Sequence, residues 1–386
     1  MRVAWVELRD FRNHRGSRLD VAPGLTVAVG PNGEGKTNLL EGIHYLLDLS
    51  SPRVSTDLPL VRIGAEAAYV RGEVETLGGR VLVEVEVRVS GANRVQVNRS
   101  PVRRKRDLRL RVRGVFFGPE DLAIGQGDPD RRRRFLDQAV VALWPVRDAA
   151  SRAYDKALRQ RNRLLKEHEV GPGAEPPALA AWDAELVEAG SALTRNRAEA
   201  MARLTGPAGE EFRRLTGVDL VTAYRPSVPV PSPADEPDRW PPGSLDDAFR
   251  ARLAERRSDE LVRRTTLVGP HRDELELRLR ELTVRSFASH GESWVAALAL
   301  RVGLARAVEA EIGEPPVLLL DDPFSGLDPE RRGRLAGRVV ELSRSGQVVA
   351  SVADAAQIPP GPSARWDVLG GAVTVADRPG DTRGAP

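Results

Sequence analysis

The sequence predicts an α/β protein in which a mixed sheet with flanking helices is interrupted by a long helical insertion. Residues 25–29 form a short apolar run, which precedes a glycine-rich turn and then an apolar helical pattern. Residues 317–320 form a second apolar run, typical of a parallel strand that is covered on both faces. Between these runs, residues 128–216 show mostly amphipathic helical periodicity, which indicates a separate helical insertion.

An antiparallel β lobe is expected after the first strands. Valines at positions 81, 83, 85, 87 and 89 alternate with the charged residues at 84, 86 and 88. This period of two predicts a strand with one buried and one wet face, and residues 94–98 predict the returning strand of a hairpin. Residues 114–117 predict a further short buried strand.

The insertion is expected to be an antiparallel helical hairpin. Two amphipathic runs flank the Gly/Pro-rich segment 170–178, which predicts a turn. At 1.5 Å per residue, each arm of the hairpin would be roughly 50 Å long. The proline-rich residues 225–244 predict a surface loop, and a last helix follows them.

These patterns divide the chain into an α/β unit and an insertion. We expect residues 1–122 and 262–376 to form the α/β unit and residues 123–261 to form the insertion. The last residues, 377–386, are predicted to be a disordered tail because they are polar and rich in Gly and Pro.

Composition excludes several classes of protein. The chain has no cysteine, so disulfides and thiolate chemistry are excluded. Its histidines show no metal-ligand spacing, and no apolar stretch approaches the length of a membrane span. No signal peptide is evident, and we expect a cytoplasmic protein without a membrane partner. The net charge is only +3, so the chain as a whole is not a strong polycation.

The segment GPNGEGKT, residues 30–37, matches the phosphate-binding pattern G-x-x-x-x-G-K-[ST] in the strand-to-helix context that this pattern requires. Its glycines let backbone N–H groups turn toward phosphate oxygens, and the helix N-terminus adds partial positive charge. Lys36 would reach the β- and γ-phosphates of a nucleotide, and the Thr37 hydroxyl would ligate Mg²⁺. The predicted ATP-binding residues are Gly30, Pro31, Asn32, Gly33, Glu34, Gly35, Lys36 and Thr37.

Two carboxylates follow the apolar run at 317–320. Ligands of parallel sheets bind beyond the carboxyl ends of the strands, so Asp321 is predicted to hold Mg²⁺. Asp322 is predicted to orient or deprotonate the attacking water. The alternative is that the pair only favours the start of the next helix.

The segment 289–292, Ser-His-Gly-Glu, opens an apolar helical run. Ser289 and Glu292 have the spacing of a capping box. Gly291 is unexpected there because glycine disfavours helix formation, unless another group must approach the backbone closely.

Taken together, the turn at residues 30–37, the Ser-x-Gly-x segment and the run LLLDDPFSGLD at 318–328 resemble ABC-type ATPases. The segments LRDFRNH (8–14), FFGPEDLAIGQGDPDRRRRFLD (116–137) and LVGPHRDEL (267–275) make the chain similar to the RecF family of bacterial DNA replication and repair ATPases. This resemblance covers about residues 2–355.

The resemblance implies an ABC-type P-loop ATPase head with an inserted arm. Members of the family form head-to-tail dimers with ATP, bind single- and double-stranded DNA without sequence preference, and act with RecO and RecR to help load RecA at gaps. It implies a slow, DNA-stimulated, Mg²⁺-dependent ATPase, with Lys36 and Asp322 as catalytic residues and Thr37 and Asp321 as metal ligands.

The resemblance also assigns two segments to the dimer. Ser289, His290, Gly291 and Glu292 would be the signature that contacts the ATP of the other subunit, and Ser325, Gly326, Leu327 and Asp328 would be the D-loop at the interface. Arg12 and Asn13 would lie near the nucleotide.

Some positions depart from the broader ABC pattern. Asp322 stands where transporters usually carry Glu, Glu292 stands where Gln is commoner, and residues 351–354 hold no switch histidine. Glu120 and Gln126 are both candidates for the Q-loop residue.

Two basic runs are candidates for DNA phosphate contacts, although a solvated charged face is the alternative interpretation of each. The runs are Arg103, Arg104, Lys105 and Arg106, and Arg131, Arg132, Arg133 and Arg134. The competing hypotheses for the whole chain are a transporter subunit, an SMC-type cohesion ATPase and a defence ATPase.

Overall fold

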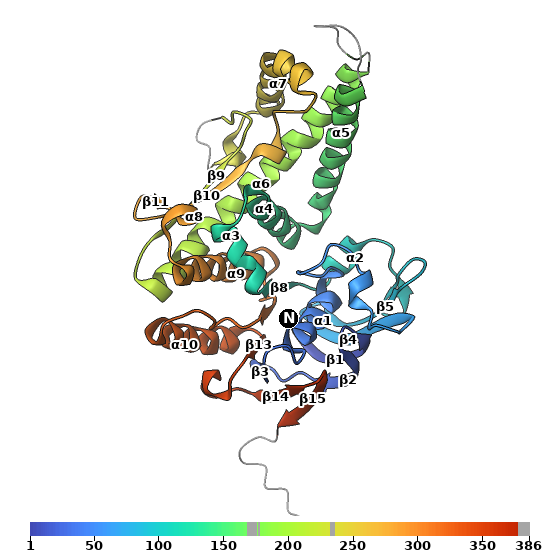
Figure 1. Cartoon of the computed structure of the whole chain (residues 1–386), viewed down its shortest axis with the longest axis vertical. Coiled ribbons are helices and arrows are strands. Elements are labelled where there is room, and N and C mark those ends of the chain that lie inside the picture. Colours follow the sequence, from blue (N-terminus) through green and yellow to red (C-terminus); the bar gives the residue numbers. More distant parts are fainter. Residues whose placement is uncertain (168–175, 177, 232–235, 377–386) are drawn as a thin grey trace, which may run out of the picture. The chain divides into compact units, whose positions relative to one another are not determined.

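The computed structural model describes residues 1–167, 176, 178–231 and 236–376 (Figure 1). The chain forms two compact units. The first comprises Met1–Leu122, Glu211–Gly217 and Ser289–Pro386, and the second comprises Ala123–Glu210 and Val218–Ala288. The predicted tail at 377–386 and most of the predicted turn at 170–178 lie outside the described residues.

The first unit contains two six-stranded sheets. The antiparallel sheet has the order β2 (His14–Asp20), β1 (Arg2–Phe11), β4 (Ala67–Thr76), β5 (Gly79–Arg88), β6 (Arg94–Val97) and β7 (Ser100–Pro101). The second sheet has the order β15 (Ala372–Ala376), β14 (Ala364–Leu369), β3 (Leu25–Val29), β13 (Val348–Val352), β12 (Val317–Leu320) and β8 (Gly114–Phe117). Its strands are parallel except for β15, so the sheet is mixed as predicted.

The alternating valines explain the antiparallel sheet. Val83, Val85 and Val87 are buried on one face of β5, while the charged residues between them face outward. Val89 does not belong to this face: β5 ends at Arg88, and Val89 is 51% exposed, because the chain turns there toward β6.

Helix α1 (Lys36–Asp48) lies between the two sheets and contacts β1, β4 and β5 on one side and β8, β12 and β13 on the other. The other helices of this unit are α2 (Lys105–Arg109), α9 (His290–Ile312) and α10 (Pro329–Ser345). Short 3₁₀ turns lie at Leu58–Leu60, Pro119–Asp121 and Ala355–Gln357. Because α1 is covered from both sides, its N-terminus is held firmly at the carboxyl edge of the second sheet.

The second unit is mostly helical. Its helices are α4 (Pro129–Leu143), α5 (Asp148–Glu167), α6 (Leu179–Thr216), α7 (Ser244–Arg263) and α8 (Val284–Phe287), and α3 (Leu122–Gln126) leads into it. The last residues of α6, Glu211–Thr216, count with the first unit, where Glu211 forms a buried ion pair with Arg338. Turns of 3₁₀ type lie at Pro145–Arg147, Pro237–Arg239 and Pro270–Arg272.

The helical hairpin is made by α5 and α6. Tyr154 and Ala157 of α5 pack with Leu186 and Val187 of α6 in one buried cluster. The first predicted run is broken into α4 and α5 at Trp144, because Pro145 cannot continue a helix from its interior.

The second unit also contains a three-stranded sheet that the predicted boundaries had divided. β10 (Glu274–Leu279) pairs with β9 (Leu220–Arg225) and with β11 (Leu282–Thr283). The α/β unit was expected to resume at residue 262, whereas the chain rejoins it at Ser289. The reason is this pairing, which holds residues 274–283 to β9 and which sequence periodicity does not reveal.

Candidate nucleotide site

The turn between β3 and α1 has the backbone shape of an anion-binding loop. Gly33 and Gly35 have φ values of 86° and 115°, which side chains rarely tolerate. A Cβ atom at Gly30 would lie 2.2 Å from the backbone oxygen of Val368, so only glycine fits there. No described side chain caps the first turn of α1, which leaves that end of the helix open to an anion.

Lys36 is buried at the start of α1 and its ammonium group stays inside the loop. Its Nζ donates hydrogen bonds to the backbone oxygens of Gly30 and Pro31, at 2.6 and 2.8 Å. Burial lowers the pKa of Lys36, and the nearby carboxylates Asp322 and Asp321 oppose that shift. The positive charge therefore lies between the loop and the carboxyl end of β12.

Asp321 follows β12 and is 1% exposed. Its Oδ1 accepts hydrogen bonds from the hydroxyls of Thr37 on α1, at 3.1 Å, and of Ser351 on β13, at 2.6 Å. Burial raises the pKa of Asp321, and these two hydrogen bonds oppose the rise. The residues predicted as metal ligands, Thr37 and Asp321, are thus in direct contact.

Asp322 is half-buried beside them. Its φ is 48°, a left-handed conformation that is uncommon for aspartate and that is stabilised by its surroundings. The backbone N–H of Asp322 donates to the Ser351 hydroxyl at 2.9 Å. Burial raises the pKa of the Asp322 carboxyl, and Lys36 opposes the rise.

Ser351 is a component of this site that the sequence did not reveal. It is fully buried, donates to Asp321 and accepts from Asp322. The parallel pairing of β13 with β12 brings it there. Nothing in the residues around position 351 signals the contact, since a serine in an apolar strand has no distinctive pattern.

The turn after β1 contacts the other side of the loop. The Asn13 amide donates to the backbone oxygen of Glu34 at 3.1 Å, and His14 lies within hydrogen-bonding distance of the backbone oxygens of Gly35 and Gly371. Arg12 is directed elsewhere: it forms a bidentate ion pair with the buried Glu41 on α1, at 2.8 Å. Of the two residues predicted near the nucleotide, Asn13 touches the loop and Arg12 supports the helix behind it.

Glu120 lies on the turn after β8, which neighbours β12 in the sheet. Its carboxylate is 3.5 Å from the guanidinium of Arg53, which also donates to Asn38 of α1 at 2.9 Å. Gln126, the other candidate for the Q-loop residue, belongs to the second unit.

The segment at 289–292 begins helix α9 with a complete capping box. The Ser289 hydroxyl accepts from the backbone N–H of Glu292, and the Glu292 carboxylate accepts from the backbone N–H of Ser289, at 3.2 and 2.9 Å. Ser289 and His290 are exposed, and the His290 ring stacks on Trp294. Glu292 is therefore engaged in capping the helix.

The neighbouring turn after Asp322 packs against this helix start. A Cβ atom on Gly291 would lie 3.5 Å from the backbone oxygen of Gly326 and 3.2 Å from Arg331. Ser325 and Gly326 are exposed, Leu327 is buried, and Asp328 caps α10 by accepting from the backbone N–H of Arg331. The predicted signature and D-loop are thus adjacent within one chain.

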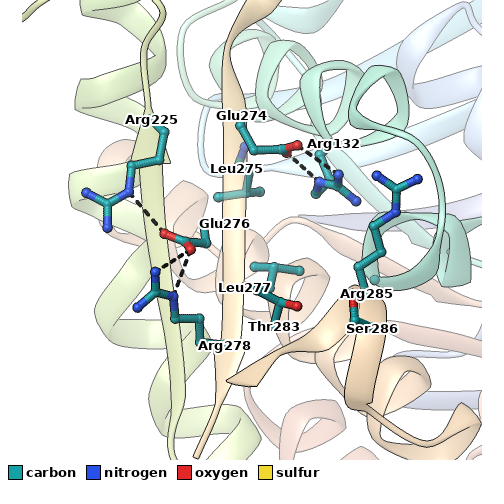
Figure 2. Close-up of a pocket in the computed structure, with 11 residues that line it drawn as sticks. Arg132, Arg225, Glu274, Leu275, Glu276, Leu277, Arg278, Thr283, Arg285 and Ser286 are labelled. Atoms are coloured by element: carbon teal, nitrogen blue, oxygen red, sulfur yellow. Dashed lines mark hydrogen bonds and ion pairs between the residues drawn. The ribbon is translucent and has the colours of Figure 1, made fainter. Parts of the chain in front are cut away.

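The second basic run is only partly available to an outside partner. Arg132 is 4% exposed and forms a bidentate ion pair with Glu274, as Figure 2 shows on one side of an open pocket. Arg133 pairs with Asp130 and donates to the backbone oxygen of Asp273. Arg132 is therefore not retained as a DNA contact, because its charge is already neutralised inside the unit.

Arg131 and Arg134 are exposed, as are Arg103, Arg104 and Lys105 of the first run. Arg106 is partly buried near Asp107. The exposure of the basic side chains therefore differs within each run. In the second run the reason is that consecutive residues of α4 point in different directions.

Comparison with known proteins identifies the family. Residues 2–358 match the model of the RecF/RecN/SMC N terminal domain. The chain is 42% identical over 388 residues to the DNA replication and repair protein RecF of Cutibacterium acnes, covering 97% of this chain and 98% of the other. The chain belongs to the RecF family. RecF of Kineococcus radiotolerans is 44% identical over 361 residues, covering 89% of this chain and 91% of that protein.

Solved structures agree with this assignment. A RecF–ATP structure, described as the recombination mediator protein in the RecFOR pathway, has a TM-score of 0.85 and 26% identity, covering 97% of both chains. The Smc head of Pyrococcus furiosus has a TM-score of 0.56 at 16% identity, covering 97% and 95%, and shows the shared fold. The RecF family is thus a family of DNA replication and repair proteins with the ABC-type ATPase fold.

None of the helices in the described part of the chain is long and apolar enough to span a membrane.

Proposed function

We propose that this RecF-family chain is an ATP-switched DNA-binding protein, in which ATP joins two copies head to tail and slow hydrolysis releases them. The observation that carries the proposal is the contact of Asp321 with Thr37 and Ser351, beside the ammonium group of Lys36. This contact brings together the loop at residues 30–37, the carboxyl end of β12 and strand β13.

Residues 30–37 would hold the ATP phosphates. Two observations support this: the positive φ of Gly33 and Gly35, and the open first turn of α1. Lys36 is bonded only to backbone oxygens of its own loop among the described residues, so its ammonium group can turn to the β- and γ-phosphates without breaking an ion pair. A solved RecF structure with ATP matches this chain over 97% of its length.

The donor set also fits Mg²⁺. A hydroxyl from Thr37 and a carboxylate from Asp321 are hard oxygen ligands, and their contact at 3.1 Å shows that they converge. Two protein ligands are few for a stand-alone site, but Mg²⁺ commonly completes its shell with phosphate oxygens and water. When bound, the ion would neutralise charge that develops on the phosphates.

Asp322 would orient the attacking water and accept its proton. It is half-buried and carries a raised pKa, which favours proton uptake by a carboxylate. Its side chain is one methylene shorter than glutamate, so we expect slow turnover. Its backbone is fixed by Ser351, which couples the position of the base to that of the metal ligand.

The exposed start of α9 would contact the ATP of a second copy. Ser289 lies at the N-terminus of a long helix, where backbone N–H groups and the helix dipole favour an anion. Gly291 keeps this surface free of a side chain, and the adjacent Gly326 belongs to the segment that would cross the interface. Engagement of Glu292 in the capping box would keep its charge from the γ-phosphate.

DNA would bind to the dimer without sequence preference and stimulate hydrolysis. Arg103, Arg104, Lys105, Arg131 and Arg134 remain the exposed members of the two basic runs. RecO and RecR are the proposed partners, and loading of RecA at single-stranded gaps is the proposed outcome, since the solved RecF relative is described as acting in the RecFOR pathway.

Sedimentation with ATP, with and without gapped DNA, tests the dimer. We expect the wild-type chain to dimerise with ATP, and Ser289→Arg to remain monomeric while still binding ATP. Ser90→Arg, at an exposed serine of the β5–β6 connection, is the matched control and should dimerise normally. Normal dimerisation of Ser289→Arg would show that α9 does not contact the partner's ATP.

A further inference from the structure

Helix α5 of the second unit carries a stripe of five basic side chains along its outer face. We name it the α5 stripe and define it as Arg152, Lys156, Arg159, Arg163 and Lys166. All five residues are exposed. Their spacing of four, three, four and three residues places them within an arc of about 80° on a helix of 3.6 residues per turn. They extend along about 21 Å of the helix at 1.5 Å per residue.

The opposite face of α5 fixes the direction of the stripe. Tyr154, Ala157, Arg161 and Leu165 are the buried residues of the helix. Arg161 is fully buried and forms ion pairs with Glu260 of α7 and Asp183 of α6. Rotation of α5 about its axis would expose this apolar and ion-paired face, so the stripe is held toward solvent.

The charge of the stripe is only partly neutralised. Arg152 pairs with Asp148 at 3.0 Å and Arg163 pairs with Glu167 at 2.8 Å. Exposed ion pairs of this kind add little to stability, so a stronger anion can displace the carboxylates. Lys156 and Lys166 form no ion pair with any residue in the described part of the chain.

The stripe differs from the contiguous run at 131–134. At 100° per residue, four consecutive arginines point around the whole circumference of α4. That geometry directs Arg132 into the ion pair with Glu274. Spacing by three and four residues instead brings every charge to one face, which is the arrangement that a linear polyanion requires.

We propose that the α5 stripe binds the phosphate backbone of DNA, an inference that rests on the proposed DNA-binding function and assigns a surface to it. Its length matches a linear polyanion, since duplex DNA carries about one charge per 1.7 Å of its axis. The described residues of α5 include no exposed large apolar side chain. Protein interfaces usually need such anchors, so an acidic protein fits the stripe less well than DNA does.

The test measures how DNA affinity depends on salt. Each lost phosphate contact lowers the slope of log K against log salt by about 0.9 for duplex DNA. The triple substitution Lys156→Gln, Arg159→Gln, Lys166→Gln should therefore lower the slope by about 2.7. The affinity lost between about 50 and 200 mM salt should then be smaller by about 40-fold. The probe is a labelled duplex of about 30 base pairs with the full chain and ATP.

Helix α7 provides a matched control. Arg250 and Arg256 are exposed and Arg252 is partly exposed, on a helix of the same 20-residue length. Each is paired three residues away, with Asp247, Asp259 and Glu255 respectively. Their triple substitution by Gln removes the same charge from the same unit. It should leave the salt slope unchanged, and ATP hydrolysis without DNA should be unchanged in both variants.

The outcomes separate this inference from the proposed function. If the wild-type chain does not bind DNA, the proposed function fails. If the wild-type chain binds DNA and both triple variants keep its salt slope, the stripe is not a DNA surface. The same conclusion follows if the salt slope falls by the same amount in both variants. The α5 variant could also keep the wild-type salt slope for DNA but lose salt-sensitive binding to RecO or RecR. That result would identify the stripe as a protein contact and would overturn the proposal.

Discussion

Ser351 is the residue whose removal best tests the nucleotide site. Ser351→Ala removes a fully buried hydroxyl that donates to Asp321 at 2.6 Å and accepts from the backbone of Asp322 at 2.9 Å. The substitution is small and leaves the strand backbone of β13 intact. Its effect therefore reports on these two hydrogen bonds.

The magnitude follows from what each bond contributes. A hydrogen bond to a charged group contributes about 1.5–3 kcal/mol, and a bond between neutral groups contributes about 0.5–1.5 kcal/mol. The variant should thus lose about 2–4.5 kcal/mol of unfolding free energy in the first unit. Removal of the Ser351 hydroxyl should also raise the pKa of Asp321 further, because its hydrogen bond opposes the rise that burial causes.

The assay combines denaturant unfolding with the Mg²⁺ dependence of ATP hydrolysis. We expect hydrolysis to require more Mg²⁺, because Asp321 is less ready to bind a cation, and to be slower, because Asp322 loses its anchor. A purely structural serine would change stability without changing the Mg²⁺ requirement.

Thr26→Val is the matched control. Thr26 lies fully buried on β3 of the same sheet, and its hydroxyl has no hydrogen-bond partner among the described residues. Valine has nearly the same shape, so we expect no loss of stability and an unchanged Mg²⁺ requirement. If Ser351→Ala behaves like Thr26→Val, Ser351 does not organise the site and the reasoning is wrong.

Two further predictions concern single side chains. The Asp322→Asn variant should bind ATP but hydrolyse it at least about 100-fold more slowly, because a general base usually contributes at least that factor. A phosphate-release assay measures the rate, and hydrolysis at the wild-type rate would exclude this role for Asp322. His271 should make the second unit sensitive to acid: burial lowers its pKa to about 4, while a hydrogen bond to Thr266 opposes the shift. Because the unfolded imidazole binds a proton near its ordinary pKa of 6.5, unfolding free energy should fall by at most about 3 kcal/mol as pH drops from about 6.5 to 4. Denaturation of His271→Gln across this range should show a flatter pH dependence, and an equally steep one would contradict the assignment.

The segment GPHRDEL, residues 269–275, is held by contacts with residues that lie far from it in the sequence. Gly269 has a φ of 129°, and a Cβ atom there would lie 2.2 Å from the Tyr154 hydroxyl. His271 contacts the same hydroxyl, and the fully buried Asp273 pairs with Arg197. The partners come from α5 and α6, more than 70 residues earlier in the chain, so the segment alone could not indicate them.

The sequence by itself determined the parts of this protein that depend on neighbouring residues. The loop at 30–37, the strands at 25–29 and 317–320 and the capping box at 289–292 follow from backbone conformation, local hydrogen bonding and apolar periodicity over a few residues. The two strands and the capping box lie at the predicted residues, and the predicted loop leads into helix α1, which begins at Lys36.

Only the tertiary structure decided which distant groups meet. Parallel pairing of β12 and β13 brings Ser351 to Asp321, and pairing of β10 with β9 moves the unit boundary from 262 to Ser289. Arg132 is buried in an ion pair with Glu274 and is not accessible to a partner. By contrast, the five basic side chains of the α5 stripe are all exposed. The physical reason is that hydrogen bonding and desolvation act between groups close in space, and the path of the chain, rather than sequence spacing, sets those distances.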